Sequence, residues 1–306
     1  NLQNIPVKGE YGKEIRRACV AEEGHTLAAF DYSQIELRVL AILSDDARLI
    51  KTFQENRDIH AAVASEVFGV PENEVTKDMR RKAKVINFGI IYGMGVTSLQ
   101  KSLGITPSTG LRASREEAQI FYENYFKKFP DVTRFLEDTK RTANQKGYTE
   151  TLFGRRRYVR GIRSPIPYIR AAAERMAINA PIQGTASDII KKAMLAVDTA
   201  LSKANLSGKT HLLLQVHDEL IYEIEKDALD SAVMIIKKEM EGAMTEKVPF
   251  LAQADVPAIV NVVGHSVEDY LTVCRRLDPI ECIAGLELNV SCPNVEGGML
   301  FGCDPF

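Results

Sequence analysis

Two aspartates lie where their carboxylates could bind a metal ion. Asp218 lies between the apolar runs Leu212–Val216 and Leu220–Ile224, a pattern that predicts two buried strands joined by a tight turn. Asp31 ends a short apolar strand over 26–31, immediately before a helical pattern. Carboxylates held on rigid backbone suit Mg²⁺, which usually binds through one or two carboxylates plus substrate phosphates. Each Asp alone also fits a plainer role, because Asp commonly starts turns and caps helices.

A helix predicted over 73–93 carries cations and aromatic rings in one row. The members, each four residues from the next, are Arg80, Lys84, Phe88 and Tyr92. Residues at this spacing share a helix face, and the row spans roughly 18 Å. Its cations suit phosphate oxygens and its rings suit a base, in the order that a nucleoside triphosphate presents them. The alternative is an amphipathic helix with a solvated basic end and a buried aromatic end.

Two further groups of residues suit nucleic acid. The basic run Arg155–Arg160, which includes one tyrosine, suits a phosphate backbone, although a solvated loop has the same composition. Arg175, Asn179 and Gln183 step by four along another helical pattern. Arg and Gln side chains are effective readers of base edges, so this row suits contact with nucleic acid.

The elements that must position these residues are mostly helical. Besides the strands around the two aspartates, the periodicity predicts a hairpin over 147–159 and helices over 33–43, 46–55, 58–67, 115–129, 131–146, 169–182, 185–204 and 227–246. We expect Pro181 to break the chain between the helices over 169–182 and 185–204, because proline removes a helical hydrogen bond.

Composition narrows the class of protein. The chain has 306 residues, of which 45% are hydrophobic and 26% charged, as in a globular protein of one large domain or two. Its net charge of −2 means that any nucleic-acid site must come from local basic clusters. The five cysteines form no C-x-x-C pair, which disfavours a cysteine metal site. No signal peptide or membrane-spanning run is apparent, so we expect a cytoplasmic protein without membrane contacts.

Six motifs follow one another in a characteristic order. They are 1–6 (NLQNIP), 31–38 (DYSQIELR), 80–93 (RRKAKVINFGIIYG), 152–158 (LFGRRRY), 179–186 (NAPIQGTA) and 215–219 (QVHDE). In this order they resemble the bacterial DNA polymerase I family, family A, over residues 1 to about 249. The resemblance implies an α+β fold with a mainly antiparallel palm sheet and helical fingers. It places the palm at 1–60 and 166–249 and the fingers at 61–165.

The resemblance also implies a function. It predicts a template-directed DNA polymerase that adds deoxynucleotides to a primer 3′-hydroxyl by two-metal phosphoryl transfer. The implied cofactor is a pair of Mg²⁺ ions. The implied partners are a DNA primer–template and deoxynucleoside triphosphates, and we expect a monomer.

The family's catalytic roles fall on few positions. Asp31 and Asp218 match its two metal-binding aspartates, and the backbone carbonyl of Tyr32 would add a metal ligand. Glu219 matches the auxiliary acid beside them. Lys84 matches the candidate proton donor to the leaving pyrophosphate.

The family's binding roles fall on the row that begins at Arg80, on the row that begins at Arg175, and on a few further residues. The nucleotide-binding positions are Arg80 and Lys84 on the triphosphate, His60 and Gln34 near it, Phe88 against sugar and base, Tyr92 at the templating position, and Glu36 as the gate against a 2′-hydroxyl. The DNA-binding positions, near the primer end and the minor groove, are Arg175, Asn179, Gln183 and His217. Phe88 lacks the hydroxyl of a tyrosine, which could fill the space of a missing 3′-hydroxyl, so we expect discrimination against dideoxynucleotides.

The N-terminal end departs from the family pattern. The chain begins inside the palm, without the thumb that grips the duplex in this family. We therefore expect impaired polymerase activity and poor binding of primer–template. The alternative function is a non-catalytic DNA-binding remnant, which would bind DNA in a salt-dependent way without extending a primer.

The C-terminal residues 250–306 resemble a different family, class 1 dihydroorotate dehydrogenase. A strand over 258–262, a helix over 266–277 and a second strand with its loop over 285–294 predict a βαβ fragment of a TIM barrel. In that family Cys292 would be the catalytic base, with Asn289 and Asn294 near flavin or orotate. A barrel needs about 250 residues, so we expect this segment to pack poorly or to form a loose βαβ appendage. A flavin-dependent dihydroorotate dehydrogenase is the alternative function that this segment alone supports, and absence of FMN absorbance in the purified protein would argue against it. The chain therefore has the pattern of a junction between two unrelated genes.

Overall fold

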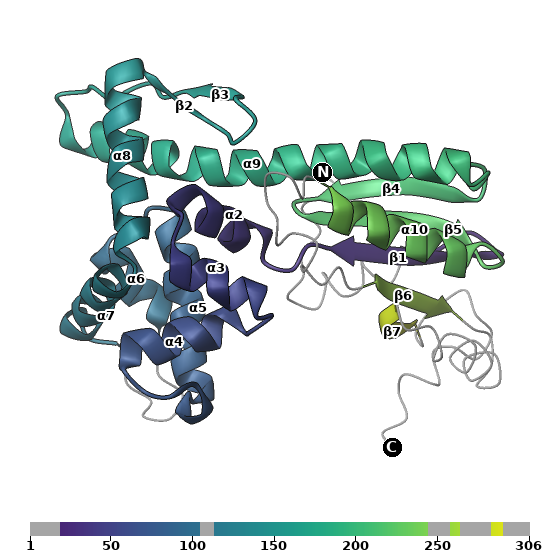
Figure 1. Cartoon of the computed structure of the whole chain (residues 1–306), viewed down its shortest axis with the longest axis horizontal. Coiled ribbons are helices and arrows are strands. Elements are labelled where there is room, and N and C mark those ends of the chain that lie inside the picture. The colour runs from purple at the N-terminus through teal and green to yellow at the C-terminus, as the bar shows by residue number, and fades with distance from the viewer. Residues whose placement is uncertain (1–18, 105–112, 244–257, 264–282, 290–306) are drawn as a thin grey trace. The chain divides into compact units, whose positions relative to one another are not determined.

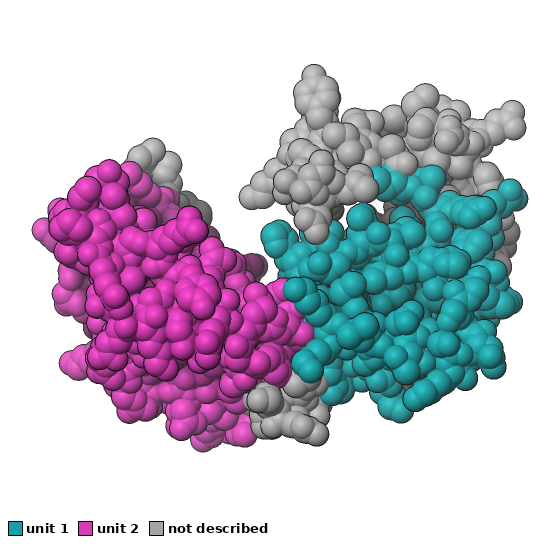
Figure 2. Space-filling model, turned by 90° about the horizontal axis from the view of Figure 1, so that it is seen from above, with its two compact units in different colours: residues 1–33, 190–243, 254–306 teal, residues 34–189, 244–253 magenta. Residues whose placement is uncertain are grey.

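The computed structural model describes residues 19–104, 113–243, 258–263 and 283–289. The described residues divide into two compact units, which Figure 2 colours separately. One unit contains 19–33, 190–243 and the two C-terminal strands, and the other contains 34–104 and 113–189.

The first unit is built on a five-stranded sheet in the order β4-β5-β1-β6-β7 (Figure 1). The strands are β1 (His25–Asp31), β4 (Thr210–Val216), β5 (Glu219–Glu225), β6 (Ala258–Val263) and β7 (Ile283–Asn289). Every neighbouring pair is antiparallel except β6 with β7. The antiparallel sheet predicted around the two aspartates is therefore present.

The core of this unit lies between the sheet and α10 (Leu229–Gly242). Alternate residues of β1 and β5 are buried, as expected for strands with one covered face. The Phe30 and Tyr222 rings meet edge to face at 5.8 Å between centroids. Helix α10 contributes buried Val233 and Ile236. Each such side chain stabilises the fold by roughly 1.5–3 kcal/mol, so the strands that carry the acids are firmly held.

Strand β4 differs from its prediction as a buried strand. It lies at the edge of the sheet, and Leu212 and Leu213 are 38% and 45% exposed. The register also shifts between Leu212 and Leu214, which is the mark of a β-bulge. The apolar run predicted a strand correctly, but hydrophobicity alone could not distinguish an edge from an interior position.

Strands β6 and β7 come from the residues that resemble dihydroorotate dehydrogenase. They match the two predicted strands, and they are parallel to each other, as in a βαβ unit. Strand β6 also pairs with β1, with Ala29 opposite Ile259. The sheet therefore continues into this segment, although we expected a loose appendage. The helix predicted over 266–277 lies outside the described residues.

The second unit is mainly helical. Its elements are α2 (Ile35–Ser44), α3 (Ala47–Gln54), α4 (Ile59–Phe68), the 3₁₀ turn η2 (Glu72–Glu74), α5 (Lys77–Ile91), α6 (Val96–Leu103), α7 (Arg115–Lys128), α8 (Pro130–Lys146), β2 (Tyr148–Glu150), β3 (Arg156–Tyr158) and α9 (Pro167–Lys203), whose last residues belong to the first unit. The predicted hairpin is present as β2 and β3. Helix α5 starts later than predicted, because the Thr76 hydroxyl caps it by accepting from Met79 N.

The prediction of a helix break at Pro181 is wrong. Helix α9 runs through Pro181 from Pro167 to Lys203. Proline removes one backbone hydrogen bond and costs about 3 kcal/mol in a helix interior. Buried Ala177 and Ile182 lie on either side of it, so packing of the flanking turns offsets that cost. Among the described residues, no helix is both long and apolar enough to cross a bilayer.

Candidate functional site

Backbone pairing in the sheet gathers three carboxylates at one end of it. Asp31 is the last residue of β1 and lies opposite Glu219, the first residue of β5. Asp218 belongs to the two-residue turn between β4 and β5. Its carbonyl accepts a hydrogen bond from Tyr32 N at 3.3 Å, which ties the turn to the end of β1. The predicted convergence of the two aspartates is therefore present, with Glu219 beside them.

The negative charges of this group repel one another. Desolvation, followed by repulsion from Asp218 and Glu219, raises the pKa of Asp31 to about 7. Desolvation also raises the pKa of Asp218. A bound cation would relieve this repulsion, and the oxygen donors fit a hard ion such as Mg²⁺. Among the described residues, no cluster of three or more His, Cys, Asp or Glu has the arrangement of a metal site. The predicted ligand set is smaller, with two aspartates and one backbone carbonyl.

Residues close in sequence to Asp31 and Asp218 have a buried side chain or an uncommon backbone conformation. Tyr32 is fully buried, and its hydroxyl donates to the carbonyl of Met240 at 2.5 Å. Gln34 and His217 both adopt a positive φ, of 57° and 53°. This conformation is uncommon for residues other than glycine, and such strain is frequent at functional sites. His217 is exposed, as a DNA-contacting position requires.

The structure separates the four cations between residues 80 and 84 of α5 into two groups. Arg81 and Lys82 are structural: Arg81 binds Asp78 and the Leu103 carbonyl, and Lys82 binds Glu117 at 2.7 Å. Arg80 and Lys84 are exposed on the other face. Arg80 Nε lies 2.6 Å from Asp58 Oδ2, whereas Lys84 makes no ion pair within the described part of the chain. The predicted phosphate-binding cations are thus the accessible ones.

His60 is buried next to this row. Its ring centroid lies 5.9 Å from that of Phe88, and its side chain is almost fully covered. Desolvation lowers the pKa of His60 to about 4, so the ring is neutral at pH 7. Asn87 Nδ2 lies 3.0 Å from His60 Nδ1. The amide nitrogen only donates, so Nδ1 accepts and the ring proton lies on Nε2.

The end of α5 meets two of the residues predicted to bind DNA. Asn179 Nδ2 donates to the carbonyl of Ile91 at 3.5 Å. A Cβ atom added to Gly93 would lie 2.9 Å from Arg175 Cγ, so Arg175 packs closely over this glycine. The Tyr92 hydroxyl donates to Glu36 Oε2 at 3.3 Å, which joins the predicted templating and gate positions. Gln183 is exposed further along α9, beyond these contacts.

Two of the four arginines in the basic run Arg155–Arg160 bind other residues of the protein. Arg155 binds Asp188 at 2.8 Å and the Gly184 carbonyl at 3.0 Å. Arg156 binds Glu150 and lies over the Tyr148 ring. Nucleic-acid contact is therefore not needed to explain these arginines.

Two residues near the basic row of α5 were not predicted from the sequence. Asp58 was recognised only as the start of a helix, and Asn87 lies unremarked inside a motif. Asp58 caps α4 and also binds Arg80, 22 residues away, so only the tertiary fold reveals its second role. Asn87 carried a usable signal, because a polar residue on the apolar side of α5 needs a partner.

Comparisons with known proteins give two family matches. A family model described as DNA polymerase family A matches residues 1–262, and one described as dihydroorotate dehydrogenase matches 229–305. The polymerase match thus extends past residue 249, where the resemblance appeared to end, and includes most of β6. Of the residues predicted from the second family, Asn289 ends β7, whereas Cys292 and Asn294 lie outside the described residues.

Individual relatives agree with the first match. DNA polymerase I of Pseudomonas aeruginosa is 46% identical over 84% of this chain and 27% of its own length. The thermostable DNA polymerase I of Thermus aquaticus is 48% identical over 84% of this chain and 29% of its own. A solved structure, the POL domain of Pol1 from M. smegmatis in complex with DNA primer-template and dNTP, is 44% identical. It has a TM-score of 0.72 over 79% of this chain and 41% of that chain. The chain therefore spans less than a third of the length of these two curated relatives.

Proposed function

The chain belongs to DNA polymerase family A, and on this premise we propose that it is a template-directed DNA polymerase. It would add deoxynucleotides to a primer 3′-hydroxyl and release pyrophosphate. The observation that carries the proposal is the group of three carboxylates, Asp31, Asp218 and Glu219, at one end of the sheet, where desolvation and then mutual repulsion raise the pKa of Asp31 to about 7. Such a group suits a reaction that brings cations to phosphate oxygens.

The first unit would supply the metal site. Asp31, Asp218 and the backbone carbonyl of Tyr32 would hold two Mg²⁺ ions, with Glu219 as an auxiliary acid. When bound, such ions make the 3′-hydroxyl more acidic and stabilise the charge of the transition state. The turn between β4 and β5 fixes Asp218, and its hydrogen bond from Tyr32 keeps the two aspartates together.

The second unit would supply the groups that bind the nucleotide. Arg80 and Lys84 would bind the triphosphate, and His60 would donate a hydrogen bond from Nε2. Lys84 would also give a proton to the leaving pyrophosphate. Gln34 lies near the triphosphate in this assignment, as the family pattern implies. These groups would bind and orient the triphosphate and protonate the leaving pyrophosphate, which are roles that the metal ligands do not fill.

The remaining predicted residues would select the substrates. Phe88 and Tyr92 would face the base, and Glu36 would exclude a 2′-hydroxyl. The DNA contacts would come from Arg175, Asn179, Gln183 and His217. Minor-groove acceptors are nearly the same for every base pair, so such contacts would test pair geometry without reading sequence.

Primer extension by the 306-residue chain tests the proposal. We expect Mg²⁺-dependent addition of the nucleotide complementary to the template, and complete loss when a chelator removes the metal. The variant Asp227→Asn is a matched control, because this exposed acid of the same unit pairs with Lys209. It should extend primers as the native chain does. Salt-dependent DNA binding without any extension would instead identify a non-catalytic DNA-binding remnant.

Phe88→Tyr tests the assignment of the nucleotide site. The added hydroxyl could fill the space of a missing 3′-hydroxyl, so the native preference for deoxy over dideoxy substrates should shrink. A hydrogen bond to a charged group contributes about 1.5–3 kcal/mol, which corresponds to roughly a 10- to 100-fold change. Competition between dideoxy and deoxy triphosphates in single-nucleotide extension measures the ratio. An unchanged ratio would remove Phe88 from the sugar-binding position.

A further inference from the structure

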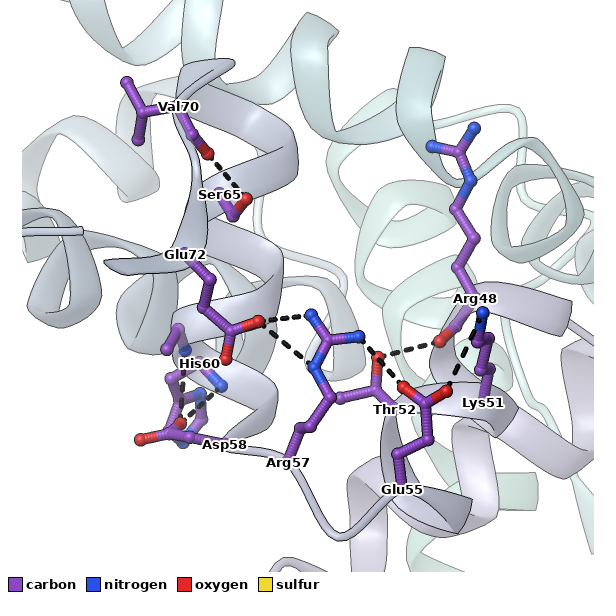
Figure 3. A network of polar contacts seen from close by, with 11 residues as sticks. Arg48, Lys51, Thr52, Glu55, Arg57, Asp58, His60, Ser65, Val70 and Glu72 are labelled. Atoms are coloured by element: carbon purple, nitrogen blue, oxygen red, sulfur yellow. Dashed lines mark hydrogen bonds and ion pairs between the residues drawn. The ribbon is translucent and has the colours of Figure 1, made fainter. Parts of the chain in front are cut away.

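Asp58 binds one of the proposed triphosphate cations while it caps a helix. Its Oδ1 accepts from His60 N at 2.9 Å and from Ala61 N at 3.1 Å, which satisfies the first turn of α4. Its Oδ2 accepts from Arg80 Nε at 2.6 Å. Figure 3 shows Asp58 beside His60 at the start of this helix. One carboxylate therefore joins the start of α4 to the basic row of α5.

The ion pair between Arg80 and Asp58 lies where a ligand can reach it. The side chains of Arg80 and Asp58 are 47% and 38% exposed. Burial alone would raise the pKa of Asp58, but hydrogen bonds from Arg80 and from backbone N–H groups lower it below its usual value. Asp58 is therefore ionised at neutral pH and forms an ion pair with Arg80. Exposed ion pairs are weak, so an anion of higher charge is able to displace one partner.

We propose that Asp58 competes with the phosphate ligand for Arg80, so that the ligand binds by exchange rather than by simple addition. This inference rests on the proposed function, because it takes the row of Arg80 and Lys84 as the triphosphate site. In the free protein Asp58 neutralises Arg80, whereas Lys84, the other cation of the row, has no ion pair among the described residues. A bound triphosphate replaces Asp58 as the partner of Arg80. Release of pyrophosphate restores the internal pair, which limits how tightly the product is held.

One substitution separates the negative charge of Asp58 from its role as a helix cap. Asn caps helices about as well as Asp, so Asp58→Asn keeps the start of α4 while it removes the competing charge. Asp46→Asn is the matched capping control, because Asp46 caps α3 in the same way through Arg48 N and Leu49 N. Glu66→Gln is the matched charge control, because Glu66 is an ion-paired acid on α4 that binds Arg48 and not the basic row.

Calorimetric binding of inorganic tripolyphosphate to the full chain tests the exchange. We expect Asp58→Asn to bind about two- to fivefold more tightly than the native chain, the range of exposed ion pairs. Neither control should match that gain. In the Arg80→Ala background the same Asp58→Asn change should have almost no effect, because the two residues act as one unit.

The outcomes separate this inference from the proposed function. One contrary outcome is that Arg80→Ala weakens tripolyphosphate binding while Asp58→Asn strengthens it by the same factor with or without Arg80. In that case Asp58 acts only as a distant charge, and the proposal that it exchanges with the ligand on Arg80 is wrong. If Arg80→Ala and Lys84→Ala both leave the binding unchanged, the row is not the phosphate site. That result would overturn the inference together with the nucleotide-binding part of the proposed function, while metal-dependent extension would still test the rest.

Discussion

Asp31→Asn is expected to remove most primer extension and, in the absence of metal, to make the protein more stable. Loss of one group that stabilises the charge of a transition state typically costs about 10²–10³-fold in rate, and we expect a decrease of at least that size. The stability gain arises because the ionised Asp31 carboxylate is desolvated and is also repelled by Asp218 and Glu219. A residue retained for its fold alone would not show these opposite effects.

The stability effect should depend on pH with a defined sign. The pKa of Asp31 is raised from 3.8 to about 7, so the folded protein binds a proton that the unfolded chain has already lost. The charge therefore costs stability increasingly as the pH rises from about 4 to about 7, and the full cost remains above 7. A full shift of this size corresponds to about 4 kcal/mol. The Asp31 residue retains contact with solvent, which screens part of this charge, so we expect on the order of 1 kcal/mol.

Urea unfolding with chelator at pH 4, 6 and 8 measures this effect. Asp31→Asn should equal the native chain at pH 4 and exceed it in free energy of unfolding at pH 8. Added Mg²⁺ should then stabilise the native chain more than the variant, because the variant lacks one proposed ligand. Asp227→Asn is the control, since Lys209 lowers the pKa of Asp227 and its loss cannot stabilise by the same route. A variant with no stability gain at pH 8 would show that Asp31 carries no electrostatic cost.

The sequence identified the basic residues of α5, but it did not show which of them are accessible to a ligand. Spacing by four identified Arg80 and Lys84, but Arg81 and Lys82 looked equally basic. Their structural roles depend on Leu103 and Glu117, which follow the row in the chain and reach it only in the folded protein. The partner of Arg80, Asp58, also lies a full helix away. Side-chain pairing of this kind has no local signal.

Backbone elements were predicted well where the hydrophobic period was regular. The strands around Asp31 and Asp218 are present, and their register places Asp31 opposite Glu219. The error at Pro181 arose because the local cost of proline was weighed without the packing of α9. The edge position of β4 was missed because the order of strands in a sheet depends on pairing between distant segments. Both errors concern tertiary context, which overrides local preference.

Gly184→Ala is expected to destabilise the protein, although alanine normally favours a helix. Gly184 lies inside α9, where alanine would ordinarily gain up to about 1 kcal/mol. Its added Cβ would lie 2.6 Å from Thr151 Cγ2 and 3.3 Å from Arg155 Nη2. Thr151 cannot turn away freely, because its hydroxyl accepts from the backbone N–H groups of Phe153 and Arg155. Overpacking of this kind costs about 1–3 kcal/mol, so the clash should outweigh the helix preference.

Two further variants separate the clash from general helix effects. Gly242→Ala is the control, because this helical glycine of α10 has open space where a Cβ would lie, and it should be neutral or slightly stabilising. Adding Thr151→Ser to Gly184→Ala removes the clashing methyl group and keeps the hydroxyl. Urea unfolding of the double variant should recover most of the lost stability. Equal stabilisation by Gly184→Ala and Gly242→Ala would mean that the hairpin does not pack tightly on α9. A destabilised single variant rescued by Thr151→Ser would show that this packing fixes the turn of α9 next to Gln183.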